Sequence, residues 1–148
     1  MRLPKDLREF IELLNSHAVE YVLVGGYAMA FHSRPRFTDD IDILVQPSPQ
    51  NAARLETVIK AFGFVSLGLS AADFLAEDGV IQLGQPPNRI DILTGISGVP
   101  FDEAWRERQF GELDGVRVPF LSRECLVRNK RATGRAKDLE DAKRLSEG

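Results

Sequence analysis

The chain is poor in cysteine, histidine and net charge, and each shortage excludes a class of protein. Its single cysteine, Cys125, cannot form an intramolecular disulfide, so we expect a protein of the reducing cytoplasm. The two histidines, His17 and His32, lack the spacing of metal ligands, and no histidine or asparagine arrangement marks Cys125 as a nucleophile. A net charge of -3 gives no overall basic field that would recruit nucleic acid.

Long apolar segments are missing as well. No apolar run approaches the roughly 18 residues that suggest a membrane span, and residues 1–6 lack the apolar core of a signal peptide. The length of 148 residues fits one compact domain. We therefore expect a single domain over residues 1–148, with a core at about 5–120 and a helical tail at about 122–147. We expect it to be soluble and cytoplasmic, with no membrane contact.

The apolar pattern predicts alternating helices and strands. Helical spacing of apolar residues indicates helices, and short β-rich apolar runs indicate strands. The predicted helices cover residues 5–17, 27–32, 51–62 and 101–108, and the predicted strands cover 21–24, 41–45, 80–83, 89–93, 111–115 and 116–120. Ser122 is a candidate N-cap for the helical tail, which Gly134 interrupts. This order predicts an α/β or α+β fold, a mixed sheet flanked by helices.

Two aspartates, Asp40 and Asp42, stand in a predicted strand. Residues i and i+2 of a strand point to the same face, so the two carboxylates should lie side by side while Ile41 and Ile43 face the core. Like charges held this close are best tolerated around a cation. A solvated acidic edge is the alternative, but acidic residues are disfavoured in strands. The pair therefore favours a divalent metal site.

A third acid, Asp91, repeats this pattern between two isoleucines. If its strand neighbours the first one, Asp91 joins Asp40 and Asp42 in a single cluster. Such a set can hold two Mg²⁺ ions, or two Mn²⁺ ions instead. Two ions align the reacting groups for an in-line displacement at phosphorus. The alternative is that Asp91 is a surface carboxylate paired with Arg89.

A glycine doublet, Gly25-Gly26, ends the predicted strand at 21–24 and opens the next helix. Exposed N–H groups at a helix N-terminus bind anions, and the missing side chains let a phosphate approach the backbone. An ordinary strand-to-helix turn is the alternative, because short glycine motifs are weak signals. Next to a metal site, the doublet favours phosphate binding.

Other polar side chains near these motifs suit a phosphate ligand. Arg36 could clamp triphosphate oxygens. Thr38 shares the parity of Asp40 and Asp42, and its hydroxyl could bond a carboxylate or a phosphate; a plain strand threonine is the alternative. The tail contains several cations, among them Lys130 and Arg135. These cations either neutralise phosphates, bind an acceptor substrate, or lie on a solvent-exposed helix face.

In this order, the motifs resemble the DNA polymerase β-type nucleotidyltransferase superfamily, and more closely its minimal nucleotidyltransferases and abortive-infection-type toxin relatives. Residues 36–42 match the form Arg-x-Thr-x-Asp-hydrophobic-Asp. Residues 130–141 are similar to the closing segment of those families, a lysine followed by Arg-x-Lys-Asp-x-x-Asp. The resemblance covers residues 21–45, 89–93 and 122–145.

The resemblance implies a nucleotidyltransferase-like mixed sheet and roles for seven residues. It implies nucleotide phosphates at Gly25 and Gly26, magnesium at Asp40, Asp42 and Asp91, and phosphates or acceptor near Lys130 and Arg135. The expected activity is transfer of a nucleoside monophosphate from a nucleoside triphosphate such as ATP to a hydroxyl of a protein, tRNA or small-molecule acceptor. The resemblance also suggests a toxin with an antitoxin partner.

Two alternatives remain at this stage. One is a nucleotide-binding or partner-binding module that keeps the fold without turnover. The other takes Asp40-Ile41-Asp42 as the metal motif of a nucleotide-sugar glycosyltransferase. No residue pattern identifies the base, the acceptor or the oligomeric state.

Overall fold

A six-stranded mixed sheet, in the order β3-β4-β2-β1-β6-β5, forms the centre of the computed structural model. The structure describes residues 3–33, 38, 40–63, 68–85 and 88–147. The strands are β1 (Tyr21–Val24), β2 (Asp40–Val45), β3 (Val80–Leu83), β4 (Arg89–Leu93), β5 (Gln109–Leu113) and β6 (Val116–Phe120). Strand β2 runs parallel to β4 and antiparallel to β1, and β1 is parallel to β6.

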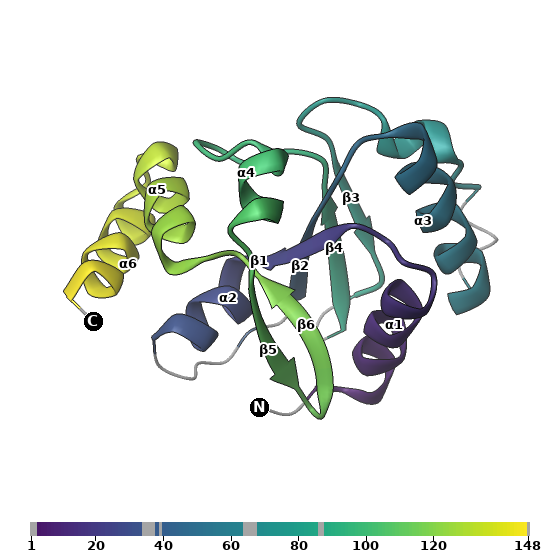
Figure 1. Cartoon of the computed structure of the whole chain (residues 1–148), viewed down its shortest axis with the longest axis horizontal. Coiled ribbons are helices and arrows are strands. Elements are labelled where there is room, and N and C mark those ends of the chain that lie inside the picture. The colour runs from purple at the N-terminus through teal and green to yellow at the C-terminus, as the bar shows by residue number, and fades with distance from the viewer. Residues whose placement is uncertain (1–2, 34–37, 39, 64–67, 86–87, 148) are drawn as a thin grey trace.

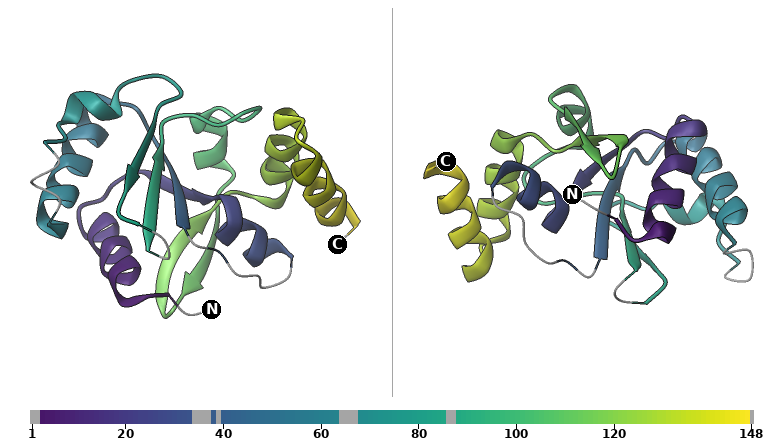
Figure 2. Two further views of the ribbon diagram at one scale, coloured as in Figure 1. Left: turned by 180° about the vertical axis from the view of Figure 1, so that it is seen from behind. Right: turned by 90° about the horizontal axis from the view of Figure 1, so that it is seen from below.

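Helices flank this sheet on separate sides, as Figure 1 shows. They are α1 (Lys5–Ser16), α2 (Gly25–His32), α3 (Pro49–Phe62), the 3₁₀ helix η2 (Ala71–Phe74), α4 (Phe101–Arg106), α5 (Arg123–Thr133) and α6 (Ala136–Glu147). Helices α1 and α3 lie side by side at one end of the molecule, and α5 and α6 form a pair at the other end (Figures 1 and 2). The expected mixed sheet with flanking helices and a helical tail is confirmed.

The core forms because apolar residues recur at the period of each element. In α1, Leu7, Phe10, Ile11 and Leu14 are buried, which is the i, i+3, i+4, i+7 stripe of an amphipathic helix. In β2, Ile41 and Ile43 are fully buried. This packing fixes the register of β2 and therefore the face on which each side chain lies. A one-residue slip of the strand would turn its isoleucines outward and its aspartates into the core.

Local signals set the bounds of several helices. Helix α3 begins after Ser48, whose hydroxyl accepts a hydrogen bond from the Asn51 N–H, and ends at Gly63 in the left-handed conformation. Helix α2 begins at Gly25, two residues earlier than predicted, because the glycine doublet itself forms its first turn.

Arg36 lies outside the described residues. No helix in the described part of the chain is long and apolar enough to cross a membrane.

Candidate active site

The parallel pairing of β2 with β4 brings three aspartates together. Asp42 lies opposite Asp91 in the register of the two strands. Asp40 precedes Asp42 by two residues, so both side chains project from the same face of the sheet. One carboxylate oxygen of each aspartate lies within 4.8 Å of those of the other two. The structure therefore gathers the three acids into one cluster, and their catalytic role stays a prediction.

The glycine turn packs directly against this cluster. Val24, the last residue of β1, pairs with Asp42, and the chain then turns at Gly25 with a φ of +65°. A Cβ atom on residue 25 would overlap Oδ2 of Asp42. A Cβ atom on Gly26 would lie 2.9 Å from Oγ1 of Thr38. Both positions therefore need glycine, because the Asp42 side chain fills the space beside Gly25 and the Thr38 side chain fills the space beside Gly26.

Thr38 supports the start of β2. Its hydroxyl donates a hydrogen bond to the backbone carbonyl oxygen of Asp40 at 2.9 Å and lies 3.5 Å from Oδ1 of the same residue. Thr38 therefore contacts both Asp40 and the glycine turn. Its predicted contact with a phosphate stays a prediction.

Arg89 lies opposite Asp40 in the register and reaches two of the three acids. Its Nη2 atom lies 2.8 Å from Oδ2 of Asp40, and its Nε atom lies 3.1 Å from Oδ1 of Asp91. From the sequence alone, the Arg89–Asp91 pair and the three-acid cluster are alternative interpretations of Asp91. The structure contains both, because residues 89 and 91 share a face of β4.

Among the described residues, the three carboxylates of the cluster have one cation paired with them, Arg89. Burial raises the pKa of Asp42 to about 7, and the charges of Asp40 and Asp91 add to this rise while Arg89 opposes it. Burial also raises the pKa of Asp91. Asp91 is buried, and within the described residues its Oδ1 atom accepts no hydrogen bond. Three clustered carboxylates with an unsatisfied oxygen fit the oxygen-rich shell of a divalent metal.

The two predicted tail cations lie in an ion-pair network between α5 and α6. Lys130 is buried, and its Nζ atom lies 3.2 Å from Oδ1 of Asp138 and 3.2 Å from Oδ2 of Asp141. Arg135 places its Nε atom 2.8 Å from Oδ2 of Asp138, although its side chain is 77% exposed. Thr133 donates a hydrogen bond to the same oxygen at 2.7 Å. In the described chain, the ion pairs of Lys130 and Arg135 are with Asp138 and Asp141, not with the three aspartates, so their predicted role at the phosphates stays a prediction.

Arginines that sequence reasoning did not single out attach this tail to the rest of the molecule. Arg123 donates hydrogen bonds to the carbonyl oxygens of His32 in α2 and Leu145 in α6. Arg128 donates to the carbonyl oxygen of Gly98 at 3.0 Å and forms an ion pair with Glu103 at 2.6 Å. Nothing in their spacing distinguishes these arginines from the solvated cations around them.

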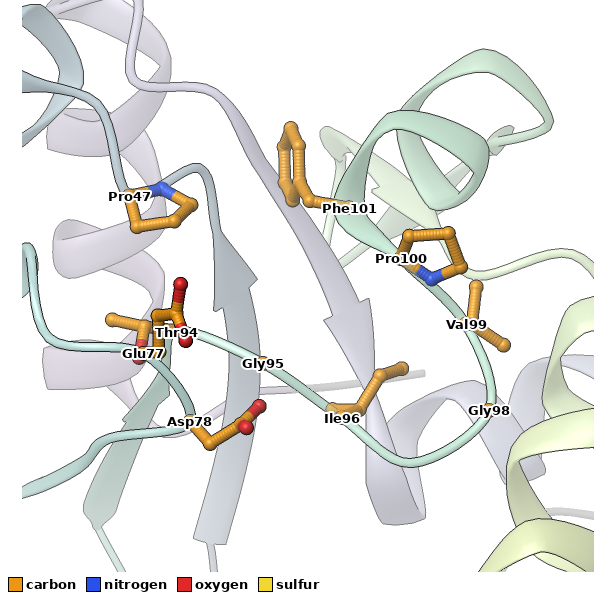
Figure 3. A pocket seen from close by; sticks show the side chains of 10 residues that line it. All are labelled: Pro47, Glu77, Asp78, Thr94, Gly95, Ile96, Gly98, Val99, Pro100 and Phe101. Carbon is orange, nitrogen blue, oxygen red and sulfur yellow. The ribbon is translucent and has the colours of Figure 1, made fainter.

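A cavity of about 450 Å³ opens at the C-terminal ends of β2 and β4 (Figure 3). On one side lie the apolar side chains of residues 96 and 99–101, and on the other lie Glu77, Asp78 and Thr94. The Thr94 hydroxyl accepts a hydrogen bond from the Gly79 N–H and donates one to the Ala76 carbonyl oxygen, both at 2.6 Å. Thr94 follows Asp91 by three residues, about 10 Å along a strand, and none of the three aspartates lines this cavity.

Comparisons with known proteins identify the family. Residues 12–104 match the profile of the family described as "Nucleotidyl transferase AbiEii toxin, Type IV TA system". This segment contains the glycine turn, β2 and β4, and therefore all three aspartates. A search of curated proteins gives no match.

Two solved structures share the fold. A presumptive nucleotidyltransferase from Thermotoga maritima aligns over 95% of this chain and 88% of its own, with 19% identity and a TM-score of 0.53. The lincosamide antibiotic adenylyltransferase LnuA, crystallised with lincomycin, aligns over 98% of this chain and 97% of its own, with 16% identity and a TM-score of 0.51. At such identities these likenesses concern the fold, whereas the profile match covers most of the chain. The chain therefore belongs to the AbiEii nucleotidyl transferase toxin family of type IV toxin–antitoxin systems and is a nucleotidyltransferase.

Proposed function

We propose that this protein transfers a nucleoside monophosphate from a nucleoside triphosphate to an acceptor hydroxyl and releases pyrophosphate, using Mg²⁺ held by Asp40, Asp42 and Asp91. The observation that carries the proposal is the convergence of these carboxylates beside the glycine turn, within the segment that matches the family. Two ions are expected, and Mn²⁺ could replace Mg²⁺. When bound, divalent ions at such a site offset the negative charge that builds up around the reacting phosphorus.

The aspartates have different tasks in this proposal. Asp40 and Asp42, adjacent on one strand face, would hold the metal together with Asp91. Asp91 also takes the proton of the acceptor hydroxyl on Oδ1, the oxygen that accepts no hydrogen bond among the described residues. Burial raises the pKa of Asp91, which makes it a stronger base than an exposed aspartate.

The glycine turn is the proposed phosphate site. Helix α2 begins at Gly25, and the first N–H groups of a helix have no partners within it. Gly25 and Gly26 have no side chains, so a phosphate can approach these donors closely. Thr38 lies beside this turn. Arg36 stands two residues before Thr38 in the chain, and both are proposed to meet the triphosphate.

The tail cations are proposed to divide their roles. Arg135, whose side chain is 77% exposed, is the cation that meets the phosphates or the acceptor. Lys130 acts through the α5–α6 pair, because its ammonium group lies between two buried carboxylates.

The proposed acceptor is a protein, a tRNA or a small molecule. The chain itself is proposed to be a cytoplasmic, single-domain toxin with an antitoxin partner, in keeping with its family.

The test is incubation of the protein with labelled ATP, CTP, GTP or UTP, Mg²⁺ and a cell extract. Transfer that disappears in Asp42→Asn but persists in Asp102→Asn, a matched change in α4, supports the proposal. Nucleotide binding without transfer to any acceptor would favour the non-catalytic module. Family membership favours nucleotide over sugar transfer, and a parallel incubation with labelled nucleotide sugars checks this preference.

A further inference from the structure

Arg89 lies at the entrance to β4, between two of the clustered acids. Its Nη2 atom donates hydrogen bonds to Oδ2 of Asp40 at 2.8 Å and to Oδ2 of Asp91 at 3.2 Å. The three side chains are 31%, 24% and 10% exposed, respectively, so water screens the pairing only in part. Among the described residues, Arg89 is the cation that forms ion pairs with this cluster. The guanidinium is therefore a counter-ion of these acids.

The fit of this guanidinium to the acids is incomplete. A permanent arginine–carboxylate pair is usually bidentate, with two parallel hydrogen bonds. Here the Nε atom of Arg89 and the Oδ1 atom of Asp91 lie 3.1 Å apart. Both atoms are nevertheless buried without a well-directed hydrogen bond in the described chain. The pairing thus consists of two hydrogen bonds from one nitrogen, Nη2, and the second half of a bidentate contact with Asp91 is missing.

Arg89 and a divalent ion would need the same oxygens. The guanidinium takes up oxygens of Asp40 and Asp91, and these two carboxylates with Asp42 make up the candidate ligand set. An oxygen that accepts a hydrogen bond from Arg89 offers less electron density to a metal ion. Loading of the cluster therefore competes with the contacts of Arg89.

We propose that Arg89 is an exchangeable counter-ion that leaves Asp40 and Asp91 on metal loading and then binds the nucleotide's phosphates. This inference rests on the proposed function. The Arg89 backbone stays opposite Asp40 in the sheet, so a released guanidinium remains beside the cluster. Its planar fork suits bidentate contact with phosphate oxygens better than a lysine ammonium group would. One side chain thus serves first as a counter-ion of the acids and then as a ligand of the phosphates.

The first test measures metal binding without nucleotide. Mn²⁺ affinity of the full chain is determined by electron paramagnetic resonance for the wild type, Arg89→Gln and Arg89→Lys. Loss of the competing cation should tighten Mn²⁺ binding about tenfold in Arg89→Gln and less in Arg89→Lys, since close charge pairs couple strongly. The matched control is Arg106→Gln, whose side chain is 69% exposed, and it should leave the affinity unchanged.

The second test measures phosphate binding with a probe that has no base. Inorganic tripolyphosphate is titrated into each protein at saturating Mn²⁺. Arg89→Gln should bind it at least tenfold more weakly, which is opposite in sign to its effect on the metal. A permanent structural brace would weaken both affinities together, and an arginine that stays on Asp40 and Asp91 would leave tripolyphosphate binding unchanged. Either result would overturn the inference.

A third measurement needs no variant and covers the case in which Arg89→Gln does not fold. The Nε–H resonance of Arg89 in the ¹⁵N-labelled wild type should shift when Mg²⁺ is added and shift again with tripolyphosphate. No shift on either addition rejects the inference. A wild type that binds neither Mn²⁺ nor tripolyphosphate rejects the proposed function instead, so the two failures are distinguishable.

Discussion

The Oδ2 atom of Asp42 fills the space that residue 25 would need for a Cβ atom, so Gly25 and Asp42 depend on each other. Gly25 directly follows β1 and Asp42 lies in the neighbouring strand β2, since Val24 pairs with Asp42 in the β1–β2 ladder. The contact holds the start of α2 against the acid cluster. A substitution at residue 25 therefore tests the site, whereas most glycine substitutions test only the backbone.

Gly25→Ala should unfold more easily and lose Mn²⁺ binding. Alanine at a φ of +65° costs about 1–2 kcal/mol in backbone strain, and its Cβ would also displace the Asp42 carboxylate. Gly134→Ala is the matched control, because its φ is +72° and nothing lies within 4 Å of its Cβ position. Urea unfolding and Mn²⁺ titration compare the two variants. Equal destabilisation with retained Mn²⁺ binding would show that the close contact does not matter.

Asp42→Asn should stabilise the metal-free protein at high pH while abolishing transfer. The pKa of Asp42 rises from 3.8 to about 7 on folding, so between these values the folded protein binds more protons than the unfolded chain. Wild-type stability therefore falls as pH rises through this window, and the variant lacks this loss. Above pH 7 the variant should gain about 1–3 kcal/mol, after discounting for partial solvation.

Urea unfolding in a chelator at several pH values between 5 and 8 tests this expectation. The difference between wild type and Asp42→Asn should grow with pH, while Asp102→Asn, on the exposed face of α4, follows the wild type. A constant difference across the range would argue against a raised pKa at residue 42.

Asp138→Asn should destabilise the protein by about 2–3 kcal/mol at pH 7, because it removes one of two partners of the buried Lys130. Burial alone would raise the pKa of Asp138, but hydrogen bonds from Thr133 and Lys130 outweigh it and the pKa is lowered. The stabilisation is therefore present above the ordinary pKa of an aspartate and is lost as pH falls through the lowered value. Glu140→Gln in α6 is the control, and thermal unfolding from pH 7 to pH 3 should bring the Asp138 variant and the wild type together.

Thr94→Val should loosen the rim of the cavity in Figure 3. Valine has nearly the same shape but leaves the Gly79 N–H and the Ala76 carbonyl oxygen without their hydrogen bonds to residue 94. The expected cost is about 1–3 kcal/mol, with faster amide hydrogen exchange at residue 79. Thr94→Ser keeps the hydroxyl and should restore slow exchange. Unchanged exchange in Thr94→Val would mean that another contact holds the rim.

The local pattern of the sequence was sufficient to predict the acids. Asp40 and Asp42 alternate with buried isoleucines, so the period of a strand places them on one face. Asp91 shows the same alternation, but its proximity depends on β4 lying parallel to β2. That neighbour relation comes from the sheet topology, which a strand's own residues do not specify.

Contacts between elements were not predictable in the same way. Arg89 pairs with Asp40 across two strands only because the register sets them opposite each other. The burial of Lys130 depends on the left-handed turn at Gly134, which folds α6 back onto α5 and brings Asp138 and Asp141 to the lysine. The sequence of such a run of cations does not indicate whether a turn buries one of them or leaves all of them exposed to solvent.

The position of β6 in the sheet determines what a shortened protein could do. Strand β6 lies against β1, and the N–H of Leu121 bonds the carbonyl oxygen of Leu23, yet both Leu121 and β6 follow residue 104, where the family match ends. A fragment cut at that boundary would leave the strand that leads into Gly25 as an unprotected sheet edge, open to pairing with other chains. The smallest unit able to present an intact glycine turn therefore extends at least through β6, the second strand after the matched segment.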